Sequence, residues 1–383
     1  VYDIDSALRS ATPDLGAKEF APCAVDAGIN SVSAPTTPFN PGMQDVKVIL
    51  QNQGTVNLTS TTIYWSVDSV LQGSYTWSGL LASGENTEIT IGSFNFLSAK
   101  TYSILAWTDA PNGGADCDIY NNACHVSEVY PALCGTYTIG GSSPDFATFG
   151  EAIDFLKRGS VSCPVTFSVR DGIYPEILEI NEIRGSSVIN TVTFESESND
   201  STAVVLLHEN TGLNGISIKG ASNLIFNKIH FFRNINGYQD GDEIIITNNS
   251  RNVTFRNCLI TGNVSHYYKT LNIATGCDSI FITGNNFDCD YTGTVIYSFD
   301  GSGLVDIRNN IISGSSSRGI FSGNTKDLRI ENNVIKNASI AIGFESYRID
   351  TAIIRNNSIS NIDIGIQLGF NNGGYFRIEG NRI

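Results

Sequence analysis

The sequence predicts an all-β protein, in which an Ig-like β-sandwich is followed by a right-handed parallel β-helix with a short N-terminal capping helix. Three observations lead to this fold class. A strand-and-turn unit recurs through residues 253–383, short alternating strands fill residues 21–132, and one amphipathic helical pattern stands at residues 149–158. The repeat carries most weight, because a fixed period of this length is the signature of stacked repeat architectures.

The repeat is marked by an apolar residue that returns at intervals of 23 to 32 residues. The markers are Phe167, Phe194, Phe226, Phe255, Ile282, Ile307, Ile330, Ile354 and Ile378. Another apolar residue follows five positions after each marker from Phe226 on, and a third strand carries Ile320, Ile342 and Ile366. Three short strands in each unit describe one coil of a parallel β-helix, in which neighbouring coils supply the core that one coil cannot bury alone.

An asparagine column accompanies the later markers. Three residues after them stand Asn285, Asn310, Asn333, Asn357 and Asn381. Stacked side-chain amides can hydrogen-bond along such a column, and Asn tolerates the left-handed backbone that a sharp turn needs. Ile229 and Cys258 occupy the same position in earlier coils, so the ladder is expected to start near the fifth coil. The fixed spacing argues against a merely polar loop.

The entry to the β-helix is predicted to be closed by a helix over residues 149–158. Thr148 and Glu151 have the spacing of a capping box. The residues on its apolar face are Phe149, Ala152, Ile153 and Leu156. Such a helix covers the exposed end of the first coil, which would otherwise invite aggregation. Cys134 and Cys163 flank the helix, and a disulfide between them would pin it to the first coil.

Residues 21–132 alternate apolar and polar side chains in short runs separated by turn residues. The clearest runs are 46–50, 63–67, 88–91 and 102–107. Strands at this spacing predict an antiparallel sandwich of about seven strands. Trp65, Trp77 and Trp107 are interpreted as sandwich core, with an aromatic sugar-binding platform as the alternative.

The loop near the end of this region carries two further candidate features. Cys117 and Cys124 are spaced for a disulfide across the mouth of a hairpin. Asp109, Asp116 and Asp118 offer oxygen ligands for Ca²⁺, and the preferred alternative is a solvated polar loop. No other cofactor is expected.

Composition limits the class of partner. The 23 basic and 38 acidic residues give a net charge of −15, which argues against nucleic acid and against an anionic membrane surface. No apolar run reaches the roughly 18–20 residues of a membrane span, so no membrane insertion is expected. The eight cysteines form no C-x-x-C pair, and disulfides are expected among the first five of them, which indicates an oxidising compartment.

Several stretches resemble known families. Val48–Gly54, Thr62–Val67 and Ala106–Asp109 resemble CARDB-type Ig-like adhesion modules. Cys134–Gly140 and Pro144–Ile153 resemble the entry of pectin-lyase-like β-helices in surface proteins of Bacteroidota that are secreted by the type IX system. Residues 1–20 resemble the closing tail of such a domain through Asp3, Asp5, Arg9, Pro13, Asp14, Gly16, Glu19 and Phe20.

These resemblances imply a domain order. Residues 1–20 are expected to close a preceding β-helix domain that lies outside the chain. Residues 21–132 form the CARDB-type sandwich, and residues 133–383 form a β-helix that is truncated at its C-terminal end. β-helix and Ig-like modules would then alternate in a longer polypeptide.

The β-helix class also includes enzymes that act on polysaccharides, so catalytic motifs are possible in this sequence. The paired Asp and Arg motifs of pectinesterases and the Asp triad with Gly-His-Gly of galacturonases are absent from the sequence. A lyase-like set would have to combine acids with a basic residue from Asp240, Asp242, Glu243, Asp288, Asp290, Lys269 and Arg233. A shallow aromatic sugar-binding surface at His266, Tyr267, Tyr268 and Lys269, with Tyr291, is the other candidate, against an exposed loop.

The sequence therefore favours a non-catalytic structural or adhesive segment of a large, multi-module extracellular protein at the cell surface. Its expected partners are other modules of the same long chain and, beyond them, cell-surface polysaccharide or neighbouring surface proteins. The alternatives are a polysaccharide-active β-helix enzyme, of lyase or hydrolase type, and a carbohydrate-binding module.

Overall fold

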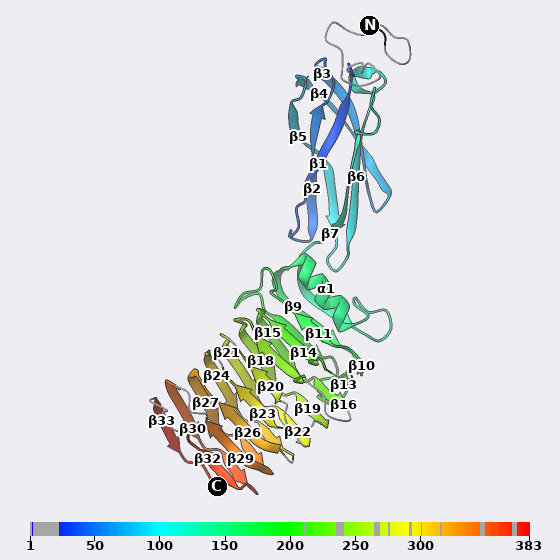
Figure 1. The fold of residues 1–383 in the computed structure, drawn as a ribbon. Coiled ribbons are helices and arrows are strands. Elements are labelled where there is room, and N and C mark those ends of the chain that lie inside the picture. The colour runs from blue at the N-terminus through cyan, green and yellow to red at the C-terminus, as the bar shows by residue number, and fades with distance from the viewer. Residues whose placement is uncertain are drawn as a thin grey trace. The chain divides into compact units, whose positions relative to one another are not determined.

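The computed structural model describes residue 2 and residues 23–209, 212–234, 241–263, 269–274, 276–290, 293–299, 301–314, 316–344, 349–369 and 374–383. The chain divides into two compact units, Val1–Pro131 and Ala132–Ile383. The predicted closing tail at residues 1–20 lies, apart from Tyr2, outside the described residues. The fold class predicted from the sequence is confirmed: a seven-stranded sandwich precedes a right-handed parallel β-helix that begins with one short α-helix (Figure 1).

The first unit packs two antiparallel sheets face to face. One sheet has the order β1-β2-β5 and the other the order β4-β3-β6-β7. The strands are β1 (Ala27–Ala34), β2 (Gly42–Asn52), β3 (Leu58–Val67), β4 (Val70–Leu81), β5 (Asn86–Phe96), β6 (Tyr102–Asp109) and β7 (Ala123–Val129). A 3-10 turn at Pro111–Gly113 lies between β6 and β7.

Alternation decides which tryptophans enter the sandwich core. Trp65 is 4% exposed and belongs to the core, and Trp77 packs against it while partly buried. Trp107 was predicted as core, and this prediction is wrong. On β6, Ile104 and Ala106 are buried in the core. Successive side chains of a strand point to opposite faces, so Leu105 and Trp107 face outward.

The sandwich is cross-linked by a disulfide between Cys23 and Cys117. The predicted pairing of Cys117 with Cys124 is therefore wrong, and Cys124 is a free, partly buried thiol. The reason lies in the sheet register. Cys124 of β7 pairs with Ala106 of β6 and packs against the sandwich core, whereas Cys117 lies in the preceding loop, where its backbone N–H donates to the Val25 carbonyl at 3.1 Å.

The second unit is built from three parallel sheets. Sheet I has, in spatial order, β33 (Tyr375–Glu379), β30 (Thr351–Arg355), β27 (Thr325–Glu331), β24 (Ser302–Arg308), β21 (Asp278–Thr283), β18 (Arg251–Arg256), β15 (Ser222–Asn227), β12 (Val192–Ser196), β9 (Val161–Val169) and β8 (Leu133–Ile139). Sheet II has β10 (Gly172–Tyr174), β13 (Val204–His208), β16 (His230–Asn234), β19 (Leu259–Asn263), β22 (Asn286–Asp290), β25 (Ile311–Ser313), β28 (Val334–Lys336) and β31 (Ser358–Ser360). Sheet III has β11 (Leu178–Ile180), β14 (Ile216–Lys219), β17 (Ile244–Thr247), β20 (Lys269–Ile273), β23 (Thr294–Ser298), β26 (Ser316–Ser322), β29 (Ala338–Phe344) and β32 (Ile364–Gln367).

The interior of the β-helix consists of columns of like side chains. All nine predicted markers lie in register on neighbouring strands of sheet I, from Phe167 to Ile378. In the early coils the column is aromatic, and the ring centroids of Phe167 and Phe194 are 4.7 Å apart, with an interplanar angle of 17°. The column of Ile320, Ile342 and Ile366 is likewise in register on sheet III.

The capping helix α1 (Phe149–Gly159) lies at the first coils (Figure 1). The Thr148 hydroxyl accepts the Glu151 backbone N–H at 3.1 Å, as in a capping box, while the Glu151 carboxylate accepts from Ala147 rather than from Thr148. Glu176 adds a second cap, since its carboxylate accepts the first helical N–H groups, those of Phe149 and Gly150, at 3.1 and 2.7 Å. The predicted disulfide between Cys134 and Cys163 flanks the helix. Within the described ranges, no helix has the length and apolar character of a membrane span.

Replacing Cys23 and Cys117 together by serine removes a cross-link over a sequence separation of 94 residues. We expect the free energy of unfolding of the sandwich to fall by about 3–5 kcal/mol, because the unfolded chain gains loop entropy. All three tryptophans belong to the sandwich, so their fluorescence in a urea titration of the whole chain reports this unit. Cys124→Ser is the matched control and should change the stability by about 1 kcal/mol or less. An equal loss in the control would contradict the pairing.

Candidate functional site

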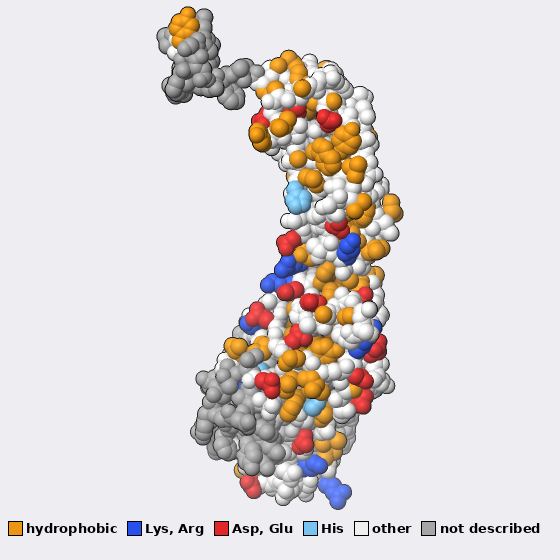
Figure 2. Space-filling view, turned by 90° about the vertical axis from the view of Figure 1, so that its right-hand side faces the viewer, with side chains coloured by type: hydrophobic (Ala, Val, Ile, Leu, Met, Phe, Trp, Pro, Cys, Tyr) orange, Lys and Arg blue, Asp and Glu red, His pale blue; other side chains and the backbone are white. Residues whose placement is uncertain are grey.

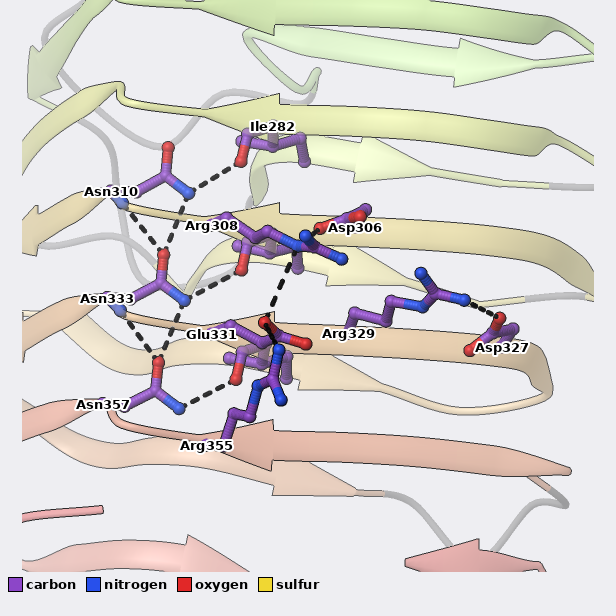
Figure 3. Close-up of polar contacts among 12 residues, drawn as sticks. Ile282, Asp306, Arg308, Asn310, Asp327, Arg329, Glu331, Asn333, Arg355 and Asn357 are labelled. Atoms are coloured by element: carbon purple, nitrogen blue, oxygen red, sulfur yellow. Dashed lines mark hydrogen bonds and ion pairs between the residues drawn. The ribbon is translucent and has the colours of Figure 1, made fainter. Parts of the chain in front are cut away.

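The asparagine column of the β-helix forms a continuous hydrogen-bonded ladder (Figure 3). The Asn333 side-chain N–H donates to the Ile307 carbonyl one coil earlier at 2.9 Å and to the Asn357 side-chain oxygen at 3.0 Å. Its own oxygen accepts the backbone and side-chain N–H groups of Asn310, each at 3.0 Å. The pattern runs from Asn285, whose oxygen accepts the Cys258 N–H, to Asn381.

The ladder residues do not themselves adopt the left-handed backbone that the sequence analysis assigned to them. That conformation belongs to the residue one place earlier, which is Asn309, Asn332 or Asn356 with φ of 56°, 56° and 54°. Gly284 and Gly380 hold the same place in their coils. The turn thus needs two adjacent residues with separate roles: the first bends the chain, and the second turns its amide inward. From Asn285 to Asn357 the ladder amides are 0–1% exposed.

Beside the ladder, the outward face of sheet I carries paired charges (Figure 3). Glu331 is 3% exposed and lies 2.9 Å from the Arg355 Nη2 and 4.0 Å from the Arg308 Nε. The Asp306 carboxylate lies 2.5 Å from the Arg308 Nε, and burial raises its pKa although Arg308 opposes this. Charges of opposite sign therefore neutralise one another along this face.

A polar cluster interrupts the apolar interior between sheets II and III. The His208 Nδ1 lies 2.9 Å from the Glu243 Oε2, and the two side chains are 1% and 3% exposed. Arg233, next to His208 in sheet register, is 1% exposed and donates from Nη1 to the Gly241 carbonyl. Gly262 leaves room for it, because a Cβ there would lie 2.9 Å from the Arg233 Cβ. Burying such groups is costly, so this cluster is the strongest catalytic candidate in the interior.

Sequence reasoning named Arg233 and Glu243 as weak candidates but missed His208. The signal was present, since His208 and Arg233 each stand two residues after an interior position, Leu206 and Phe231, and a strand returns to the same face every second residue.

Three further members of the lyase-like set, Asp242, Lys269 and Asp288, make other contacts. Asp242 accepts the backbone N–H of Lys269 at 3.0 Å and the side-chain amide of Asn272 at 2.6 Å. The Lys269 ammonium instead lies 4.8 Å from the centre of the Tyr297 ring on sheet III. Asp288 is exposed on β22, where it accepts the Ser313 hydroxyl.

The other members of the two β-helix candidate sets cannot be placed. Asp240, His266, Tyr267, Tyr268, Tyr291 and the side chain of Asp290 lie outside the described part of the chain.

The acidic loop of the sandwich has a different membership from the predicted Ca²⁺ set. Asp116 and Asp118 act electrostatically on Asp26, a residue that the sequence analysis did not name. Burial raises the pKa of Asp26, the hydrogen bond from Asn121 opposes this, and the charges of Asp116 and Asp118 add to the increase. Asp109 accepts the N–H of Ala110 at 2.9 Å.

Several oxygens of this loop are already used by the backbone. Asp116 accepts the N–H groups of Ala27 and Asp118 at 3.2 and 3.1 Å, and Asp118 accepts that of Tyr120 at 3.1 Å. Cys23 and Cys117 lie against Asp26, but their sulfurs form the disulfide and are not thiolate ligands. The Ca²⁺ set of Asp109, Asp116 and Asp118 therefore stays a prediction, with Asp26 as a further carboxylate beside Asp116 and Asp118.

Residues 294–383 match the family model described as "Right handed beta helix region". No curated protein matches the chain.

Three similar solved structures cover from 30% to 91% of this chain. A CARDB domain from Pyrococcus furiosus, in complex with di-metal ions, is 18% identical with a TM-score of 0.25, covering 30% of this chain and 99% of its own. Pectin methylesterase from Aspergillus niger is 13% identical with a TM-score of 0.30, covering 63% and 86%. A family 28 exopolygalacturonase from Yersinia enterocolitica is 10% identical with a TM-score of 0.34, covering 91% and 81%. At these identities the likeness concerns the fold alone.

Asn285 and Asn286 offer a matched test of the ladder, because they are neighbours with opposite exposure. Asn285→Ala removes the buried hydrogen bonds that Asn285 gives to the Phe255 carbonyl and accepts from the Cys258 N–H, so we expect the free energy of unfolding of the β-helix to fall by about 2–5 kcal/mol. Asn286→Ala removes an exposed side chain and should cost about 0.5 kcal/mol or less. Far-UV circular dichroism during denaturant titration measures both, and equal losses would contradict the structural role of the ladder.

The raised pKa of Asp26 predicts a pH dependence of sandwich stability. A carboxyl whose pKa is higher in the folded than in the unfolded state costs stability when ionised, and this cost falls as the pH drops through the folded pKa. Asp26→Asn removes the titration. The free energy of unfolding of the variant minus that of the wild type should therefore be larger at pH 7 than at pH 4. Tryptophan fluorescence in urea titrations at the two pH values measures it. A stability difference that does not change with pH would exclude the effect.

Proposed function

We propose that this chain is a non-catalytic structural and adhesive segment of a large, multi-module extracellular protein at the cell surface. The observation that carries the proposal is the uninterrupted ladder from Asn285 to Asn381, which fixes each coil to the next through buried hydrogen bonds. In this role the β-helix serves as a stiff rod, and the sandwich serves as a spacer or adhesive unit.

The covalent chemistry and the module types support an extracellular setting. Two disulfides, one in each unit, are typical of proteins that fold in an oxidising compartment. The sequence resemblance to type IX-secreted surface proteins of Bacteroidota leads us to propose the same secretion route. The partners would be other modules of the same long chain and cell-surface polysaccharide or neighbouring surface proteins.

A polysaccharide-active enzyme is the second candidate, and one observation favours it. The buried pair of His208 and Glu243, with Arg233 beside it, places a base, an acid and a cation in one region of the β-helix. Ionisable groups are costly to bury, which makes this cluster a candidate for a functional site. The pair would have to become accessible to substrate, since both side chains are almost fully buried.

Mechanical and enzymatic measurements separate the two candidates. Pulled by its ends in a single-molecule instrument, the β-helix should release coils in steps of about 8 nm, which is the extended length of a 24-residue coil such as that from Ile330 to Ile354. Asn285→Ala should lower the release force and Asn286→Ala should not. The same protein should not depolymerise or demethylate pectin, polygalacturonate or α-1,3-glucan. Turnover that is lost in a folded Glu243→Gln variant would overturn the non-catalytic proposal.

A further inference from the structure

The outward face of the sheet β4-β3-β6-β7 carries a hollow. Its volume is about 270 Å³. The lining residues are Ser66, Ser69, Leu71, Ser103, Leu105, Trp107 and His125. This size lies just below the usual range of small-ligand sites, roughly 300–1,000 Å³, which suits one or two rings of a larger molecule.

Sheet register explains why these side chains meet. Trp107 on β6 pairs with Tyr64 on β3, and Leu105 pairs with Ser66 on one side and with His125 of β7 on the other. All of them point away from the sandwich core, because the alternate positions Ile104 and Ala106 are buried within it. Three neighbouring strands thus contribute to one surface.

An aromatic wall borders the hollow. The rings of Trp107 and Tyr64 are stacked with centroids 5.7 Å apart and an interplanar angle of 21°. Stacking orders the Trp107 side chain before any ligand binds. Binding on the indole therefore costs little further side-chain entropy of the protein. The face of an aromatic ring carries negative potential, which attracts the weakly positive C–H groups of a sugar ring.

The polar groups of the hollow are not engaged elsewhere. Ser66 is 6% exposed, yet within the described residues its hydroxyl makes no hydrogen bond. The same holds, across the described ranges, for the hydroxyls of Ser69 and Ser103 and for the imidazole of His125. Hydroxyl and imidazole groups without a protein partner can exchange hydrogen bonds with the hydroxyls of a ligand.

The lining carries no carboxylate, ammonium or guanidinium group. The adjoining acid, Asp68, is already held by the Lys100 ammonium at 3.1 Å and by the Ser103 backbone N–H at 2.9 Å. An anionic ligand would find no cation here and would meet a chain of net charge −15. A cationic ligand would find no free carboxylate in the lining.

We propose that this hollow binds a neutral saccharide, with a sugar ring stacked on Trp107 and sugar hydroxyls bonded to Ser66, Ser103 and His125. The inference rests on the proposed adhesive function and names the ligand class of the sandwich. An apolar peptide is the competing occupant. It fits less well, because its apolar side chains cannot exchange hydrogen bonds with the hydroxyls and the imidazole of the hollow.

The test uses the whole chain and a defined set of probes: the hexasaccharides of cellulose, amylose, laminarin, β-mannan and xylan, with hexagalacturonate as the anionic control. Tryptophan fluorescence and isothermal titration calorimetry measure binding. At least one neutral probe should bind, and hexagalacturonate should bind at least tenfold more weakly. Trp107→Ala should weaken the neutral probe about tenfold or more, and Ser66→Ala should weaken it several-fold.

Tyr75→Ala is the matched control, since Tyr75 is a 39% exposed aromatic residue of β4 that does not line the hollow. Its affinity should equal that of wild type, and urea titrations should show that every variant is folded. The inference is overturned if no neutral probe binds, if Trp107→Ala binds as wild type does, or if hexagalacturonate or an apolar peptide binds more tightly. Stepwise coil release without saccharide binding would leave the structural proposal standing and remove this inference alone.

Discussion

The stacking of each coil on its predecessor is the constraint on which the β-helix depends, because no single coil can bury its own inward side chains. Phenylalanine rings fill the marker column in the early coils, and isoleucines fill it from Ile282 onward. A turn between sheets I and II brings peptide groups into this interior. The ladder amides satisfy them, since each donates to a carbonyl of the previous coil and accepts an N–H from its neighbour. Apolar stacking and polar satisfaction therefore impose the same period.

One part of the interior departs from this rule. His208, Arg233 and Glu243 are buried where the regular coils place apolar or small residues, such as Cys289 and Gly262 in the register column of Arg233. These coils are also longer than the later ones, with marker gaps of 32 and 29 residues rather than 23 to 25. Because the connections in these coils are longer, their strands need not follow the regular repeat of the later coils. A polar cluster fits here, whereas it would interrupt the asparagine ladder further along.

How far the sequence predicts the structure follows from the same logic. Periodicity fixed the markers, the ladder positions and the capping helix, because each repeats or follows a local rule. It failed where the answer depended on contacts distant in sequence. Cys117 lies near Cys124 along the chain but meets Cys23 through the sandwich, and Asp26 joins Asp116 from 90 residues away. Composition suggested a core position for Trp107, whereas the alternation of β6 turns it outward.

The two outward faces described above differ in what they leave available. On sheet I, Asp306, Arg308 and Glu331 neutralise one another, so a ligand would first have to break ion pairs that already exist. On the sandwich, the Ser66 hydroxyl makes no hydrogen bond among the described residues, and Trp107 is stacked on Tyr64 and only partly buried. Polar groups without a protein partner, next to an aromatic ring that stacking holds in place, favour the binding of a ligand from solvent. Of the two faces, the one on the sandwich is for this reason better suited to contact a partner.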